Sequence, residues 1–140
     1  MRPTLFYRIA AILLLLFAAG HTFGFLGFRP TSPEGRAAMD AMATVFTEDG
    51  AHFSYAGFYR GFGLFGGLAL LLMAVWIWWL GSLARTMPRA TITPGIAMLL
   101  FQLGNLVLAW LYFPLPPVIF SAVLILVLAV AVGGAARSKP

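Results

Sequence analysis

Long unbroken runs of apolar residues dominate the pattern along this chain. Four such runs cover about residues 5–28, 58–80, 95–113 and 117–135. At about 1.5 Å of rise per residue, helices of these lengths reach roughly 28–36 Å, enough to cross the roughly 30 Å hydrocarbon core of a bilayer. Strands of a membrane barrel alternate in polarity, and the run over residues 68–79 does not. We therefore predict an all-α fold, a four-helix transmembrane bundle that forms a single membrane domain over residues 1–140.

Composition supports a membrane class and excludes several others. Hydrophobic residues make up 61% of the 140 residues and charged residues 9%, and cysteine is absent. Soluble domains have roughly 25% charged residues, and a chain of this length cannot hide so much apolar surface from water. The absence of cysteine excludes disulfide scaffolds, thiolate metal sites and cysteine nucleophiles.

Charge is distributed unevenly between the predicted connections. One side has six cations and no acidic residue, namely Arg2, Arg8, Arg85, Arg89, Arg137 and Lys139. The other side has all four acids with three cations, Arg29, Arg36 and Arg60. The positive-inside rule then predicts cytoplasmic termini and an outward loop over 29–57, for a chain in the inner (plasma) membrane. The net charge of +5 indicates orientation and attraction to anionic lipid, and no nucleic-acid partner.

The outward loop contains a helical pattern of its own. Ser32 is a suitable N-cap and Pro33 suits the first helical position, where its missing N–H costs nothing. Apolar residues then recur at helical spacing as far as Phe46, which predicts a short amphipathic helix over about 33–46 in the first extracytoplasmic loop. An interfacial helix, a lid over a pocket and a partner-docking helix all fit this pattern.

Polar side chains within the spans fall at one depth. His21 precedes Arg29 by eight residues and Asn105 precedes Phe113 by eight, so both lie roughly 12 Å below the outer end of their spans. Arg60 is roughly 9 Å inside the second helix if that helix begins near Ser54. Polar groups in hydrocarbon are costly and indicate a site or an interhelical contact. We expect an outward-facing pocket whose ligand is oriented by His21, Arg60, Gln102 and Asn105, with Tyr55 and Tyr59 at the entrance.

Each of these residues also has a structural interpretation. His21 could bond to Asn105 or to a backbone carbonyl and so join two helices. Arg60 could extend to the outer headgroups or pair with Glu48 or Asp49. Gln102 and Asn105 are most often interhelical hydrogen-bonding groups, worth about 0.6–2 kcal/mol each.

Glycines four residues apart recur in the first two spans. The pairs are Gly20 with Gly24, Gly57 with Gly61, and Gly63 with Gly67. This spacing lets helix backbones approach closely. It predicts tight packing of the first two spans or, as the alternative, a homo-oligomer formed through one of these faces.

Other motifs with a chemical meaning are few. The sequence contains no HExxH, no paired histidine spacing and no glycine-rich phosphate loop, so zinc hydrolysis and nucleotide binding have no support. No acidic residue lies within a predicted span, which argues against a proton-coupled pump. His52, just before the second span, is a loop histidine, a lid residue or an axial metal ligand.

Two resemblances follow from short segments. Gly20–Gly24 (GHTFG), Ser32–Gly35 (SPEG) and the segment 54–63 (SYAGFYRGFG) together resemble an uncharacterised family of small bacterial four-helix membrane proteins, which implies the fold and no activity. The chain is also faintly similar to styrene oxide isomerase, a four-helix membrane enzyme with haem b at subunit interfaces. The resemblance lies in the SPEG loop at Ser32–Gly35 and the Ala-His pair, Ala51 and His52, before the second span, with about a dozen more residues between them here. It implies His52 as the axial haem ligand and Tyr59 or Arg60 facing substrate.

Three function classes therefore stay open. The first is a multi-pass membrane protein whose outward-facing pocket binds a small apolar or amphipathic molecule. The second is a non-catalytic accessory subunit of a membrane complex, whose polar residues only hold helices together. The third is a haem-b-dependent isomerase. Whether the chain catalyses any reaction is left open by the sequence.

Overall fold

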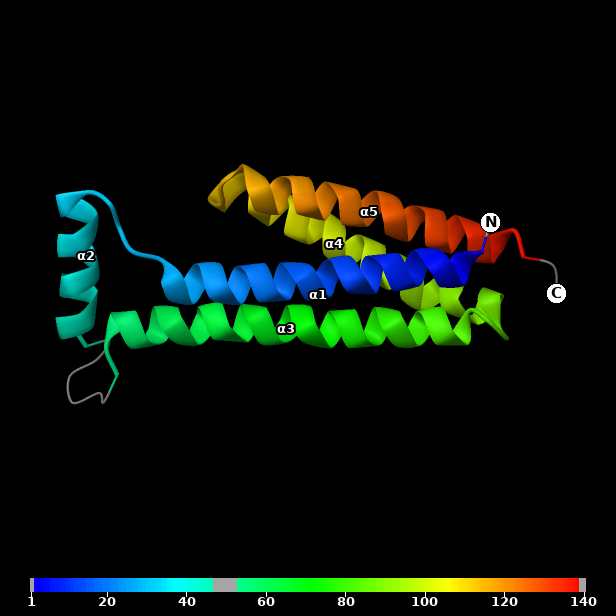
Figure 1. Ribbon diagram of the computed structural model, residues 1–140, viewed down its shortest axis with the longest axis horizontal. Coiled ribbons are helices and arrows are strands. Elements are labelled where there is room, and N and C mark those ends of the chain that lie inside the picture. Colours follow the sequence, from blue (N-terminus) through cyan, green and yellow to red (C-terminus); the bar gives the residue numbers. More distant parts are fainter. Residues whose placement is uncertain (1, 47–52, 139–140) are drawn as a thin grey trace. The chain divides into compact units, whose positions relative to one another are not determined.

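The fold of the described residues is built from helices. A computed structural model describes residues 2–46 and 53–138. The elements in order are α1 (Pro3–Gly27), α2 (Pro33–Thr44), α3 (Tyr55–Leu83), a short 3₁₀ helix η1 (Pro88–Thr91), α4 (Ile92–Tyr112) and α5 (Leu115–Ala136) (Figure 1). Four helices, α1, α3, α4 with η1, and α5, are long and apolar enough to cross a membrane. The all-α prediction is confirmed, and the architecture is that of a multi-pass membrane protein.

The helices extend beyond the most apolar runs. α3 has 29 residues, about 44 Å at 1.5 Å per residue, whereas the sequence predicts 58–80. A length near 44 Å matches the hydrocarbon core together with both headgroup layers, so the helix continues through residues that are too polar for a hydropathy run. α4 begins at Ile92 after η1, three residues before the expected start. Pro94 lies in its first turn, where backbone N–H groups have no intrahelical partner.

The chain divides into two compact units, and α1 and α3 contribute to both. Unit 1 comprises residues 1–17 and 70–140, and unit 2 comprises residues 18–69. Each unit therefore contains one part of α1 and one part of α3, with α2 in unit 2 and with η1, α4 and α5 in unit 1.

Unit 1 contains a continuous apolar core. Its buried residues come from the first part of α1, from the part of α3 after residue 69 and from α5. They include Tyr7, Leu14, Ile77, Leu80, Leu124 and Leu128. The Tyr7 hydroxyl donates to the Thr91 carbonyl at 3.1 Å. A Cβ at Gly95 would collide with that hydroxyl, so this glycine lets α4 approach Tyr7. A buried tyrosine is thus satisfied at the junction of η1 and α4.

Unit 2 contains α2, which crosses the ends of α1 and α3 in Figure 1. α2 begins at Pro33, and the Ser32 hydroxyl accepts from the Gly35 N–H at 3.0 Å, as the sequence predicts. It ends at Thr44, two residues before the expected Phe46, because Val45 is extended. The Val45 carbonyl accepts from the Tyr55 N–H at 3.1 Å. The position of α2 on the outer membrane surface remains a prediction.

Candidate functional site

His21 forms the polar contact between α1 and α3 in unit 2. Its Nε2 lies 2.9 Å from the Gly63 carbonyl oxygen. A carbonyl can only accept a hydrogen bond, so Nε2 is the donor in this contact. The backbone carbonyl is one of the two partners that the sequence suggests for this histidine. A bond from His21 to Asn105, which belongs to unit 1, remains a prediction. The bond joins residues 42 positions apart in the chain and so fixes the register of α1 against α3 in this unit.

Three glycines on α3 make that approach possible. A Cβ at Gly63 would collide with the Phe25 ring, and one at Gly67 would lie 2.7 Å from the Thr22 hydroxyl oxygen. A Cβ at Gly66, which belongs to none of the predicted glycine pairs, would lie 3.4 Å from His21 Nε2. Close packing of the first two spans at Gly63 and Gly67 is therefore confirmed. In the sequence, only the adjacent Gly67, a member of a predicted pair, indicates that Gly66 could also lie at this contact.

The other glycine pairs do not make such contacts. A Cβ at Gly20, Gly24 or Gly61 would meet no described atom within 4 Å, and one at Gly57 would meet only Ser54 and Phe53 at 3.7 Å or more. These glycines do not bring α1 and α3 together within unit 2. A second copy of the chain on these faces remains a prediction.

Aromatic rings continue the contact beyond His21. The His21 and Phe25 rings are stacked with centroids 6.1 Å apart, and the Phe25 ring lies 5.3 Å from that of Tyr59. Tyr55 and Arg60 are exposed on the same stretch of α3. Four of the six predicted site residues, His21, Tyr55, Tyr59 and Arg60, therefore belong to unit 2.

Gln102 and Asn105 belong to unit 1, on α4. The Asn105 Nδ2 donates to Gln102 Oε1 at 3.2 Å, a contact between residues three apart on one helix face. Gln102 is buried and Asn105 partly buried, as expected for polar side chains within a span. That they share one pocket with His21 and Arg60 remains a prediction.

An apolar groove lies on α3 in unit 2. Its volume is about 400 Å³, and we call it the aromatic groove, defined by Phe53, Gly57, Phe58, Gly61, Phe62 and Phe65. The rings of Phe58 and Phe62 meet edge to face at 4.8 Å between centroids. Gly57 and Gly61 provide the small side of the groove, because they leave open space that a side chain would fill. Sequence reasoning missed this groove, although phenylalanines flanking two glycines at helical spacing are a signal for it.

The aromatic groove and the contact with α1 use opposite sides of α3. Residues two apart on a helix point about 160° apart, because 3.6 residues make one turn. Gly61 borders the groove, and Gly63 receives the Phe25 ring. Arg60 is the only cation on this stretch of α3. It lies three residues, or nearly one helical turn, after Gly57, beside the groove and not among the residues that define it.

The structure provides no metal-binding cluster in residues 2–46 and 53–138. Among them no group of three or more His, Asp or Glu side chains could hold a metal ion. His52, the haem ligand that the styrene oxide isomerase resemblance implies, lies outside the described residues, as do Glu48 and Asp49. Haem ligation by His52 and pairing of Arg60 with either acid therefore stay predictions.

Comparison of the chain with protein-family models, with curated proteins and with solved structures finds no match.

Proposed function

We propose that this multi-pass membrane protein binds a small amphipathic molecule on α3. The apolar body of the ligand occupies the aromatic groove, and an anionic or carbonyl group of the ligand bonds to Arg60. The observation on which this rests is the groove itself, with four phenylalanines and two glycines around about 400 Å³. That volume falls in the range of small-molecule sites, which are mostly apolar with a few polar groups.

Arg60 gives the site its preference among ligands. The side chain is exposed, and a guanidinium near an apolar surface strongly favours an ionised or carbonyl oxygen. Tyr55, also exposed on this stretch of α3, adds a hydroxyl at the entrance. In this proposal His21 and Tyr59 hold α1 in place behind the site.

Filling the groove tests the proposal directly. The full-length protein in mild detergent is titrated with dansyl-labelled undecanoic acid, a fluorescent carboxylate with an apolar chain. We expect G57L/G61L to lower its affinity at least about tenfold, since leucine side chains remove the apolar contact surface. The matched control is G20L/G24L, because both replace open glycines of unit 2. Equal affinity in the two variants would contradict binding in the groove.

Arg60 is tested with the same probe and its uncharged methyl ester. R60Q should lower the affinity for the carboxylate about tenfold, because a charge-assisted hydrogen bond is worth about 1.5–3 kcal/mol. The affinity for the ester should change much less. A loss of equal size for both probes would assign Arg60 a packing role and remove the preference for an anion.

A non-catalytic accessory subunit is the second candidate function. It is favoured by the way the polar groups are used, because His21 bonds to the Gly63 carbonyl and Asn105 bonds to Gln102. A partner protein would cover an open glycine face such as that of Gly24. Under this candidate, G24L abolishes co-purification of a larger partner without lowering the stability of the chain itself. Under the ligand-binding proposal, G24L has no effect.

A further inference from the structure

A second groove lies in unit 1, between the first part of α1 and the last part of α3. We call it the α1–α3 groove, and its volume is about 200 Å³. It is defined by Ala11, Ile12 and Leu15 of α1 and by Leu71, Ala74, Val75 and Trp78 of α3. Each set follows helical spacing, so the groove is apolar, runs along both helices and is open on one side.

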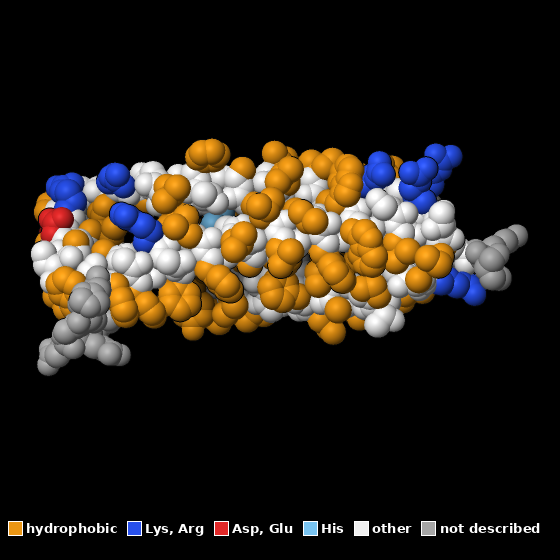
Figure 2. Space-filling model, turned by 90° about the horizontal axis from the view of Figure 1, so that it is seen from below, with side chains coloured by type: hydrophobic (Ala, Val, Ile, Leu, Met, Phe, Trp, Pro, Cys, Tyr) orange, Lys and Arg blue, Asp and Glu red, His pale blue; other side chains and the backbone are white. Residues whose placement is uncertain are grey.

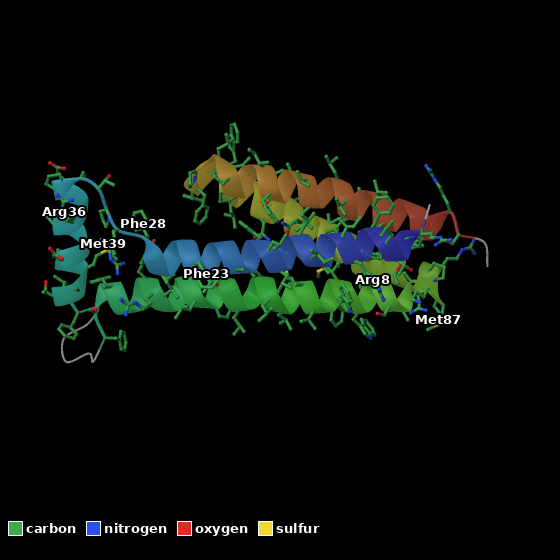
Figure 3. All side chains as sticks on the ribbon, in the orientation of Figure 1. Arg8, Phe23, Phe28, Arg36, Met39 and Met87 are labelled. Atoms are coloured by element: carbon green, nitrogen blue, oxygen red, sulfur yellow. The ribbon has the colours of Figure 1, made fainter. Side chains whose placement is uncertain are left out.

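An arginine closes one end of this groove. The Arg8 guanidinium carbon lies 4.8 Å from the centroid of the Trp78 ring, a cation–π contact. A Cβ at Gly81 would lie 3.3 Å from Arg8 Cγ, so Gly81 leaves room for the arginine stem against α3. Arg8 lies near the same end of the unit as Met87 (Figure 3). The guanidinium is thus held in place at the border of an apolar channel.

Arg8 has hydrogen-bonding capacity that unit 1 does not use. Its Nε is buried and has no hydrogen-bond partner among the described residues. No Asp or Glu side chain of this unit can supply one, since all four acidic residues of the sequence fall within 18–69. A buried donor of a charged group without a partner is costly. Arg8 as a whole is partly exposed, so an anionic group from outside the chain can approach the terminal nitrogens of the guanidinium, which share its positive charge with the buried Nε.

The depth of Arg8 fits a phosphate of the bilayer. Arg8 lies five residues after the start of α1 at Pro3, and Trp78 lies five residues before the end of α3 at Leu83. Both are about 8 Å from their helix ends, and a headgroup layer is roughly 5–8 Å deep on each side of the hydrocarbon. If the helix ends reach the outer edge of that layer, the Arg8 backbone lies at the boundary with the hydrocarbon. From there the long arginine side chain can extend to the lipid phosphates, and the apolar groove continues toward the middle of the bilayer.

The remaining charges of unit 1 favour the same kind of ligand. Basic side chains gather at the end of this unit where the termini lie (Figures 1 and 2). Unit 1 contains six of the nine cations of the chain and no acid. Each basic residue near a membrane surface attracts anionic lipid by about 1 kcal/mol. This charge raises the local concentration of anionic lipid, and Arg8 with the groove would select one molecule from it.

We propose that unit 1 contains a binding site for one anionic phospholipid. The lipid phosphate bonds to the Arg8 guanidinium over the Trp78 ring, and one acyl chain lies in the α1–α3 groove. A free phosphate ion would not occupy the apolar groove, and a neutral apolar molecule would not bond to the Arg8 guanidinium. A lipid with both an anionic phosphate and an acyl chain satisfies both parts of the site.

The first experiment compares lipids on the intact protein. Full-length protein in mild detergent is titrated with dioleoyl phosphatidylglycerol and, separately, with dioleoyl phosphatidylcholine, and bound lipid is counted by native mass spectrometry. The two lipids have the same chains and differ in net charge. We expect one phosphatidylglycerol to bind about tenfold more tightly than phosphatidylcholine. Equal binding of the two lipids would overturn the proposal, as would equally tight binding of glycerol phosphate, which has no chains.

Two charge variants separate the site from the general basic surface. R8Q and R2Q each remove one positive charge from the same end of unit 1, but only Arg8 touches Trp78. R8Q should lower phosphatidylglycerol affinity about tenfold and abolish the preference over phosphatidylcholine, whereas R2Q should lower affinity a few-fold at most. V75W, which fills the exposed side of the groove, should weaken both lipids. Equal losses in R8Q and R2Q would assign the effect to surface charge alone.

A fluorescence measurement does not depend on any Arg8 variant. A protein in which Trp76, Trp79 and Trp110 are replaced by phenylalanine keeps Trp78 as its only tryptophan. In vesicles of phosphatidylcholine, a small fraction of chain-brominated phosphatidylglycerol should quench Trp78 several-fold more than the same fraction of brominated phosphatidylcholine. Equal quenching by the two lipids would show that no anionic lipid is held beside Trp78.

Discussion

The helices of the two compact units pack through different kinds of residue. Unit 1 contains large buried side chains such as Leu14 and Leu128, and its charged residues are all cations. Within unit 2, α3 contacts α1 through glycines and aromatic rings. This unit contains three cations and four acids. In a bilayer, packing rather than exclusion of water holds helices together. In unit 1 large interlocked side chains form the core and glycines allow close approach only at its border, at Gly81 and Gly95. In unit 2 glycines form the contact between α1 and α3 itself.

The comparison also separates two kinds of exposed apolar surface. In unit 2 the aromatic groove lies on the side of α3 away from α1, next to one cation. In unit 1 the α1–α3 groove lies between two helices and ends at Arg8. The first arrangement suits a small molecule that rests against one helix. The second suits a chain that lies between two helices.

The largest expected effect comes from adding a side chain at Gly63. G63L places carbon atoms where the Phe25 ring lies, and Phe25 is itself held between His21 and Tyr59. Overpacking of this kind costs about 1–3 kcal/mol, so we expect a clear drop in the midpoint of thermal unfolding in detergent. G24L is the matched control, since its Cβ meets open space. If G63L and G24L unfold at the same temperature, unit 2 does not depend on close helix approach.

A smaller loss is expected from His21. H21A removes the hydrogen bond to the Gly63 carbonyl, and interhelical bonds of this kind in membranes contribute about 0.6–2 kcal/mol. H21Q can still donate from its amide and should recover part of the loss. Stability is followed by thermal unfolding, and an H21A protein as stable as the native one would show that glycine packing alone holds unit 2.

The counterpart in unit 1 is the tyrosine hydroxyl. Y7F removes the hydrogen bond to the Thr91 carbonyl and keeps the buried ring. The expected loss is about 0.6 kcal/mol, below that of H21A, because the apolar core of unit 1 stays intact. A loss in Y7F greater than in G63L would reverse the comparison and make unit 1 the one that depends on a polar contact.

The smallest expected effect on stability concerns His52. The resemblance to styrene oxide isomerase implies haem b, which would give the purified protein a Soret band in its visible absorption spectrum. Under that hypothesis H52A removes the band and leaves helicity unchanged. A colourless native protein would reject the haem-dependent isomerase and leave the ligand-binding and accessory candidates.

The class of the protein and the number of candidate spans follow from the sequence alone. Apolar runs near 20 residues long impose helices, because a backbone in hydrocarbon must satisfy its hydrogen bonds within its own segment. The start of α2 was also decided locally, by Ser32 and Pro33. Helix ends were not, since α3 continues to Leu83 through residues of the headgroup layer that interrupt a hydropathy pattern.

Which small and polar residues come into contact depends on how the helices pack in three dimensions. Glycines of one spacing look alike in sequence, yet Gly63 receives a ring and Gly61 borders a groove, because residues two apart on a helix face opposite ways. His21 could bond to several acceptors, and the packing of α1 on α3 in unit 2 chose the Gly63 carbonyl. In the sequence, Arg8 is interpreted only as one of the positive charges that orient the chain in the membrane. Its position over Trp78 requires two segments 70 residues apart to be brought together, and no local pattern encodes that distance.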